Sequence, residues 1–138
     1  MLSIFNRIDH IGFAVKDINT TAAFYVKNGW ELSPIVQETV QHARIAFLTN
    51  ETMPTIELVS PLEGASPVDR FLLNGGVQPY HICYEVDDVM AAINELHNQD
   101  FIPLFMPVQS VAMEGRLICY LYNKDVGLIE VVESKHSN

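Results

Sequence analysis

Two histidines and two glutamates recur at matching places in the two halves of this 138-residue chain. His10 begins the run His-Ile-Gly-Phe-Ala-Val-Lys-Asp, and His81 begins the similar run His-Ile-Cys-Tyr-Glu-Val-Asp-Asp. Glu57 stands within Ile-Glu-Leu-Val, and Glu130 stands within Ile-Glu-Val-Val. Two imidazoles and two carboxylates form a mixed nitrogen and oxygen set that suits Zn, Co, Ni, Mn or Fe and leaves positions for water or substrate. The repeat therefore predicts one divalent metal ion held by these four side chains.

Each of these residues has a simpler interpretation when it is taken alone. A histidine in an apolar strand is more often a hydrogen-bonded core or surface residue, and a glutamate in an alternating strand usually faces water. The repetition favours the metal site, because a pseudo-two-fold relation between the halves would bring all four side chains together. The charge of a divalent ion would also offset the cost of burying both carboxylates.

The elements that must position these residues follow the same order in each half. Hydrophobic periodicity and turn residues predict a β-α-β-β-β sequence twice, which places the chain in the α+β class. Asp17 and Asp88 each follow the first strand of a half and are placed to cap the helix after it. We expect a single domain over residues 1–138, whose modules at about 7–60 and 79–133 are joined by a segment at about 61–78.

Residue ranges can be predicted for the strands and helices of each module and for the joining segment. The joining segment contains a short predicted helix at about 67–73, with Ser66 as its N-cap. The strands are predicted at about 7–15, 31–38, 43–49 and 54–60 in the first module, and at about 79–86, 102–108, 115–122 and 127–133 in the second. The helices are predicted at about 18–27 and 89–98.

Composition and charge exclude several classes of protein. The chain is 49% hydrophobic with a formal net charge of −9, which is typical of a globular domain and unlike a protein that binds nucleic acid or an anionic membrane through a basic face. No apolar run approaches the roughly 20 residues of a membrane span, and the N-terminus does not resemble a signal peptide. Cys83 and Cys119 stand in apolar runs and are predicted to be buried thiols, so we expect a cytoplasmic location.

At these motifs the chain resembles the vicinal oxygen chelate superfamily of glyoxalases, bleomycin resistance proteins and dioxygenases, and within it methylmalonyl-CoA epimerases. The resemblance follows the chain from end to end, through the segments 9–12, 46–48, 56–62, 81–88 and 127–130. It implies two βαβββ modules that form a cup-shaped mixed sheet in the glyoxalase-like fold. It also implies that His10, His81 and Glu130 are metal ligands and that Glu57 occupies a position where relatives carry Gln or Glu.

The resemblance implies a metal-dependent isomerase or epimerase that stabilises an enolate of an acyl thioester, with a carboxylate taking and returning the proton. It further implies a small-molecule substrate, such as an acyl-CoA, and a homodimer. The catalytic candidates are Glu130, Glu57 and Glu38. Glu38 is included because the position of the epimerases' proposed base is occupied by Val40 here. Glu38 lies two residues earlier, and its side chain is on the same strand face as that of Val40 if the segment stays extended.

Two further segments depart from the epimerases. Residues 111–116, Val-Ala-Met-Glu-Gly-Arg, replace their glycine-rich loop, and Tyr122-Asn123 replaces their His-Pro. Other functions within the superfamily therefore stay open. A glyoxalase I-type lyase uses the same His/Glu/His/Glu set, a ring-cleaving dioxygenase uses two His and one Glu on iron, and a small-molecule-binding or resistance protein of this fold needs no metal.

Overall fold

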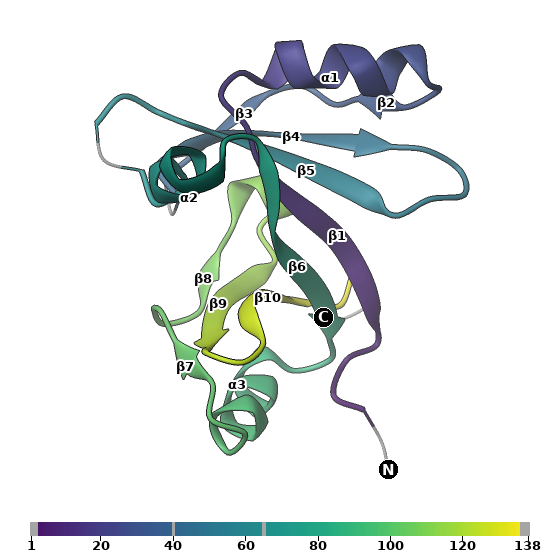
Figure 1. Cartoon of the computed structure of the whole chain (residues 1–138). Helices are drawn as coiled ribbons and strands as arrows, with labels where there is room; N and C mark the ends of the chain where they lie inside the picture. Colours follow the sequence, from purple (N-terminus) through teal and green to yellow (C-terminus); the bar gives the residue numbers. More distant parts are fainter. Residues whose placement is uncertain (1–2, 40, 65, 136–138) are drawn as a thin grey trace. The chain divides into compact units, whose positions relative to one another are not determined.

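Strands and helices follow one another in the same order in the two halves of the chain (Figure 1). The computed structural model describes residues 3–39, 41–64 and 66–135. Contacts between residues define two units, which we call the 10–80 unit and the 81–138 unit, and the second includes the N-terminal residues up to Asp9. Both units combine helices with a small sheet, so the α+β class predicted from the sequence is confirmed.

The elements of the first half are β1 (Arg7–Ala14), α1 (Ile18–Lys27), β2 (Glu31–Leu32), β3 (Val36–Glu38), β4 (Ala43–Thr49), β5 (Thr55–Pro61) and α2 (Val68–Gly75). The elements of the second half are β6 (Gln78–Val86), α3 (Val89–His97), β7 (Ile102–Pro103), β8 (Val108–Gln109), the 3₁₀ turn η1 (Val111–Met113), β9 (Leu117–Asn123) and β10 (Gly127–Glu133).

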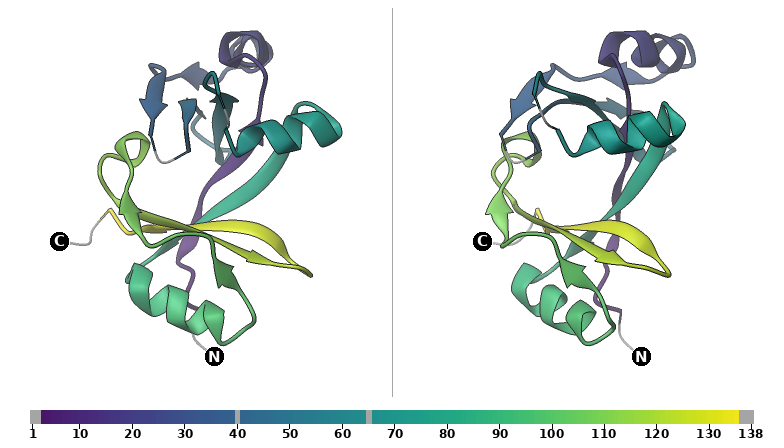
Figure 2. Two further views of the ribbon diagram at one scale, coloured as in Figure 1. Left: turned by 90° about the vertical axis from the view of Figure 1, so that its left-hand side faces the viewer. Right: turned by 60° about the vertical axis from the view of Figure 1, so that its left-hand side comes forward.

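The first and last long strands of each half lie side by side and run parallel. In the 10–80 unit the strand order is β2-β4-β5-β1, with β3 also paired to β4. In the 81–138 unit the order is β6-β10-β9-β7, with β8 also paired to β9. The pairs β1–β5 and β10–β6 are parallel, whereas β4–β5 and β10–β9 are antiparallel hairpins. A helix packs against one face of each sheet, α1 in the first unit and α3 in the second (Figure 2).

These two helices begin at the predicted aspartates. The Asp17 carboxylate accepts hydrogen bonds from the Thr20 N–H at 2.9 Å and from the Thr20 hydroxyl at 2.7 Å. These bonds hold the pKa of Asp17 below its ordinary value of 3.8, because they stabilise the charged form. The Asp88 carboxylate accepts from the Ala91 N–H at 3.0 Å in the same way. Both aspartates satisfy an N–H group that the first turn of a helix leaves without an intrahelical acceptor.

The apolar core is divided between the two helix–sheet contacts. In the 10–80 unit it consists of Val15, which follows β1, and of side chains from α1, β4 and β5, namely Ile18, Ala22, Ala46, Leu48, Ile56 and Leu58. In the 81–138 unit it includes Val89, Ile93 and Leu96 of α3 and Cys119, Leu121, Ile129 and Val131 of the strands. Cys83 and Cys119 are buried thiols, as predicted, and burial raises the pKa of Cys119 to about 11.

Two predicted strands are interrupted. The segment predicted as one strand at 31–38 forms β2 and β3, and the segment predicted at 102–108 forms β7 and β8. Each interruption contains a proline, Pro34 or Pro107, which has no N–H to donate to a neighbouring strand. Backbone hydrogen bonds still reach the long strand at each break: the Ser33 N–H donates to the Phe47 carbonyl at 2.9 Å, and the Leu104 N–H donates to the Tyr120 carbonyl at 2.8 Å.

Helix α2 begins differently from the prediction. Its N-cap is Pro67 and has no side-chain cap hydrogen bond. Ser66, the predicted cap, instead donates its hydroxyl to the Gln41 carbonyl at 3.2 Å, and its own N–H donates to the Asp69 carboxylate at 3.1 Å. The serine therefore ties the start of α2 to the turn after β3, a tertiary contact that local pattern does not show.

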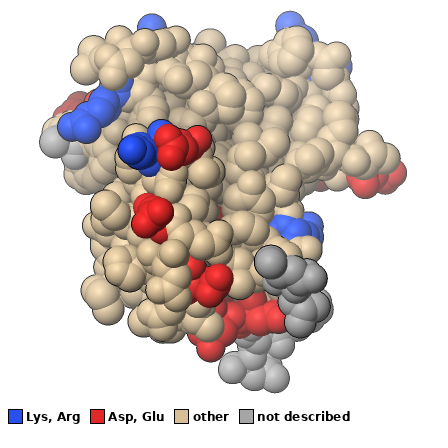
Figure 3. All heavy atoms as spheres, turned by 60° about the horizontal axis from the view of Figure 1, so that its bottom comes forward, with Lys and Arg blue, Asp and Glu red and all other residues tan. Residues whose placement is uncertain are grey.

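Charged side chains are scattered over the face drawn in Figure 3, where the described Lys and Arg residues form no continuous basic patch. Among the described residues, no helix has the length and apolar character needed to cross a bilayer.

Replacing Asp88 with Ala is expected to lower the free energy of unfolding by about 1 kcal/mol, because the first turn of α3 loses its side-chain acceptor. Urea unfolding followed by circular dichroism measures the change. Asp88→Asn is the matched control, since asparagine also caps well and should lose much less. Equal losses in both variants would show that the negative charge, and not the hydrogen bond, stabilises the helix.

Candidate metal centre

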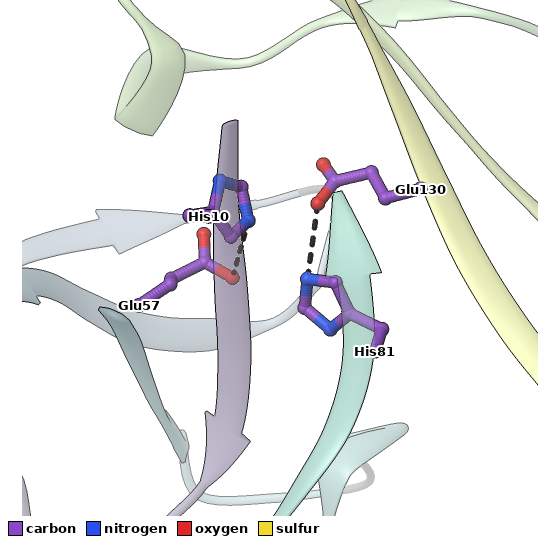
Figure 4. A group of neighbouring side chains, drawn as sticks. All are labelled: His10, Glu57, His81 and Glu130. Carbon is purple, nitrogen blue, oxygen red and sulfur yellow. Dashed lines mark ion pairs between the residues drawn. The ribbon is translucent and has the colours of Figure 1, made fainter. Parts of the chain in front are cut away.

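His10 and Glu57 form a buried pair in the 10–80 unit. Glu57 of β5 lies directly opposite Gly12 of β1, and His10 is two residues before Gly12 on the same face of the strand. The His10 Nε2 atom is 3.4 Å from the Glu57 Oε1 atom, and the two side chains are 0% and 1% exposed. Figure 4 shows this pair joined across the two parallel strands.

His81 and Glu130 form the equivalent pair in the 81–138 unit. Glu130 of β10 lies opposite Cys83 of β6, and His81 is two residues before Cys83. The His81 Nε2 atom is 3.0 Å from the Glu130 Oε1 atom, with exposures again of 0% and 1% (Figure 4). The same strand register thus brings a histidine and a glutamate together twice, which follows from the repeat in the sequence.

An aromatic ring accompanies each pair, and the sequence interpretation did not single out either ring. Phe47 of β4 lies opposite Glu57, and Tyr120 of β9 lies opposite Glu130. The Phe47 ring meets His10 edge-on at a centroid distance of 5.7 Å, and the Tyr120 ring meets His81 edge-on at 5.1 Å. The signal was available in the repeat, since each aromatic residue stands ten positions before its glutamate (47 and 57, 120 and 130).

The geometry of each pair suits a divalent ion. Each pair offers one imidazole nitrogen and one carboxylate oxygen, and all four residues are buried. Ligand bonds of about 2.1 Å place adjacent ligand atoms about 3.0 Å apart at a right angle and about 3.4 Å apart at a tetrahedral angle. The distances of 3.0 Å and 3.4 Å within the two pairs match these values. The donor chemistry and spacing therefore fit the metal ligands that the sequence predicted.

Glu38 lies on the same sheet face as Glu57, at the end of β3. It is opposite Ala43 of β4, which shares a strand face with Phe47, the residue opposite Glu57. Glu38 is 1% exposed, although a carboxylate at a strand end ordinarily reaches water. Ala43 and Phe47 are four residues apart on β4, about 13 Å along an extended strand. Glu38 thus lies on the ligand-bearing face but away from the His10–Glu57 pair.

The chain turns directly after Glu38. The sequence prediction that Glu38 shares a strand face with position 40 requires this segment to stay extended, and that condition is not met. Strand β3 ends at Glu38 and a turn leads into β4, because the two strands form an antiparallel hairpin. Val40, which occupies the position of the epimerases' base, lies outside the described residues. The turn is held from outside by the Tyr80 hydroxyl, which donates to the Gln41 side-chain oxygen at 3.3 Å.

The segment that replaces the glycine-rich loop is tied down within the 81–138 unit. The Ser110 carbonyl accepts from the N–H groups of Met113 at 3.1 Å and Gly115 at 2.8 Å. The Arg116 guanidinium donates to the carbonyl oxygens of Met113 at 3.1 Å and Glu133 at 3.2 Å, and its Nη1 atom lies 3.6 Å from the Asp9 carboxylate. A chain without a glycine-rich sequence here therefore still makes a compact turn.

Comparison with known proteins identifies relatives of the whole chain. The profile of the Glyoxalase/Bleomycin resistance protein/Dioxygenase superfamily matches residues 9–120. The chain is 33% identical to the mitochondrial methylmalonyl-CoA epimerase of Homo sapiens over 93% of its length and 74% of the human protein. It is 32% identical to the ethylmalonyl-CoA/methylmalonyl-CoA epimerase of Cereibacter sphaeroides over 86% of its length and 90% of that protein.

Solved structures of epimerases are also similar. A methylmalonyl-CoA epimerase in complex with methylmalonyl-CoA and NH4⁺ has a TM-score of 0.84 at 29% identity, covering 97% of this chain and 98% of the other. A Streptomyces coelicolor methylmalonyl-CoA epimerase variant in complex with 2-nitronate-propionyl-CoA has a TM-score of 0.83 at 29% identity, covering 95% and 99%. These relatives and neighbours indicate an enzyme, and the similarity extends over both units.

Adding a divalent ion to the chelator-treated protein is expected to raise its melting temperature, because an ion that binds the native state stabilises it by about 2.7 kcal/mol at 100 times its Kd. Glu130→Gln should abolish this rise while changing the melting temperature of the metal-free protein little, since glutamine keeps the shape and an acceptor oxygen. Differential scanning fluorimetry with Zn²⁺, Co²⁺, Ni²⁺ and Mn²⁺ measures both effects.

Glu114→Gln, at an exposed position of the same unit, is the control and should keep the full metal-induced rise. A full rise in Glu130→Gln would remove that carboxylate from the ligand set.

Proposed function

The chain belongs to the Glyoxalase/Bleomycin resistance protein/Dioxygenase superfamily, and from this premise we propose that it is a metal-dependent epimerase acting on the α-carbon of an acyl-CoA thioester of the methylmalonyl-CoA type. The observation that carries the proposal is the buried His–Glu pair found in both units of a chain related to methylmalonyl-CoA epimerases. The structures of such enzymes with methylmalonyl-CoA and with 2-nitronate-propionyl-CoA support this substrate class.

We infer that His10, Glu57, His81 and Glu130 together hold one divalent ion, of Zn, Co, Ni, Mn or Fe. The two modules, at about 7–60 and 79–133, would then act as halves of one domain that share a single site. Burial supports this assignment, because two carboxylates removed from water need a compensating positive charge. A bound divalent ion would supply Lewis-acid stabilisation of negative charge on the substrate's oxygens.

The carboxylates of the chain would carry the proton. Epimerisation requires that the α-hydrogen leaves as a proton from one face of the carbon and that a proton returns on the other face, so a base is needed on each side. The proposed candidates are Glu38, Glu57 and Glu130, each 1% exposed. The negative charge gained by the thioester during transfer is that of an enolate.

We also propose an oligomeric state and a cellular location. The resemblance to epimerases supports a homodimer, and the two buried thiols support a cytoplasmic location. A second candidate function is a glyoxalase I-type lyase, because that enzyme type uses the same His/Glu/His/Glu set, with a glutamate at the position of Glu57.

Incubation of the metal-loaded protein with methylmalonyl-CoA in D₂O is expected to exchange the α-hydrogen for deuterium, because the base must release its proton to solvent between turnovers. Proton NMR of the substrate measures the exchange, and prior chelation should stop it. His10→Ala should lose exchange and metal together. A loaded protein that leaves the α-hydrogen in place would contradict the epimerase assignment, and turnover of a glutathione hemithioacetal would then favour the lyase.

Glu38→Gln is expected to lower the rate of α-hydrogen exchange by about 100-fold or more, the usual contribution of a positioned general base. Metal affinity should stay that of the unsubstituted protein, since Glu38 is not among the proposed ligands. Glu31→Gln, at an exposed position on β2, is the matched control. An unchanged exchange rate in Glu38→Gln would leave Glu57 and Glu130 as the carboxylates that carry the proton.

A further inference from the structure

Phe47 and Tyr120 hold equivalent places in the two units, down to their backbone contacts. Each lies opposite the glutamate of its unit, and each ring meets the histidine edge-on. Each carbonyl accepts a hydrogen bond from the residue at the strand break, Ser33 or Leu104. An aromatic ring therefore packs against the imidazole in both units, with a hydroxyl in one unit and without it in the other.

The two rings differ in one functional group. Tyr120 adds a phenol hydroxyl and is itself 7% exposed, and Ile118, two residues earlier on the same strand face, is 0% exposed. The Phe105 ring also packs edge-on against Tyr120, with centroids 5.9 Å apart. The ring of Tyr120, the residue opposite Glu130, therefore contacts both His81 and Phe105.

We propose that the Tyr120 hydroxyl is a further catalytic group, which donates a hydrogen bond to a substrate oxygen that gains negative charge when the α-proton leaves. This inference rests on the proposed epimerase function. A phenol suits the task because it is neutral and protonated at neutral pH and can donate to an anion without adding charge of its own. A donor held in place before the reaction stabilises the developing charge without reorganisation.

The asymmetry between the halves supports a role in chemistry. Phe47 shows that this fold accommodates phenylalanine at the equivalent place, opposite a buried glutamate and beside a buried histidine. The edge-on packing against the histidine therefore does not itself require a hydroxyl, and the place of Tyr120 on the face that bears Glu130 puts it within the proposed site.

The test is Tyr120→Phe, which removes only the hydroxyl and reproduces the residue found in the other half. The probe is 2-nitronate-propionyl-CoA, whose charged nitronate oxygens mimic those of the enolate, and its affinity for the metal-loaded protein is measured by calorimetry. We expect affinity about tenfold to 100-fold weaker than in the unsubstituted protein, the usual effect of losing a hydrogen bond to a charged group. Metal affinity and melting temperature should stay close to their original values.

Tyr84→Phe is the matched control. Tyr84 is opposite Val131 on the other face of the same sheet and stacks on Phe5, so loss of its hydroxyl should leave the affinity unchanged. Nitronate affinity in Tyr120→Phe within twofold of the original would overturn the proposal, because the hydroxyl would then serve the folded structure alone.

A second variant covers the case in which Tyr120→Phe folds poorly. Site-specific 3,5-difluorotyrosine at position 120 keeps the ring and the hydroxyl but lowers the phenol pKa. Nitronate binding should then weaken at a lower pH than in the original protein, since an ionised phenol no longer donates, and an unshifted pH profile would contradict the proposal. Failure of the unsubstituted protein to exchange the α-hydrogen would instead count against the epimerase function, so the two failures are distinguishable.

Discussion

Two glutamates lie almost wholly out of water, each beside an imidazole, and the surrounding structure has to make that burial tolerable. Moving an isolated carboxylate into a protein interior costs several kcal/mol, so it persists only where charge or hydrogen bonds compensate. At His10–Glu57 and His81–Glu130 the compensation within each unit comes from the facing imidazole, at 3.4 Å and 3.0 Å. A buried acid–imidazole pair is weak support for stability, and its nitrogen and oxygen atoms are of the kinds that could hold a metal ion.

The parallel pairing of the first and last strands of each half brings the histidine and the glutamate together. Parallel neighbours need a long crossover between them, and each half supplies one through a helix and an antiparallel hairpin. A histidine near the start of the half and a glutamate near its end can therefore face each other across one strand spacing. Asp17 and Asp88, which follow the first strands of the two halves, cap the helices with which the crossovers begin.

The sequence predicted the parts that repeat and missed the parts that depend on tertiary contacts. The His and Glu positions, the capping aspartates and the order of elements are visible because each is tied to a local pattern present twice. Pro34 and Pro107, which stand at the two strand breaks, are visible in the sequence, but the strands predicted at 31–38 and 102–108 ran through both. The hydroxyl of Ser66 was assigned to its own helix, whereas the fold directs it to Gln41. The proposed role of Glu38 was made conditional on an extended segment after it, and the hairpin pairing of Glu38 with Ala43 shows that the chain turns there.

The strand breaks have a consequence for the way the molecule meets copies of itself. The outermost strands of the two units, β2 and β7, are two residues long, and the segment around β7 displays Ile102, Leu104 and Met106 at 64%, 54% and 74% exposure. A long regular strand with such a row of apolar side chains would be a template for sheet extension and aggregation. Pro103 and Pro107 remove the backbone donors on which that extension depends. The border of this sheet can therefore carry apolar side chains in water while offering a neighbouring chain little backbone to pair with.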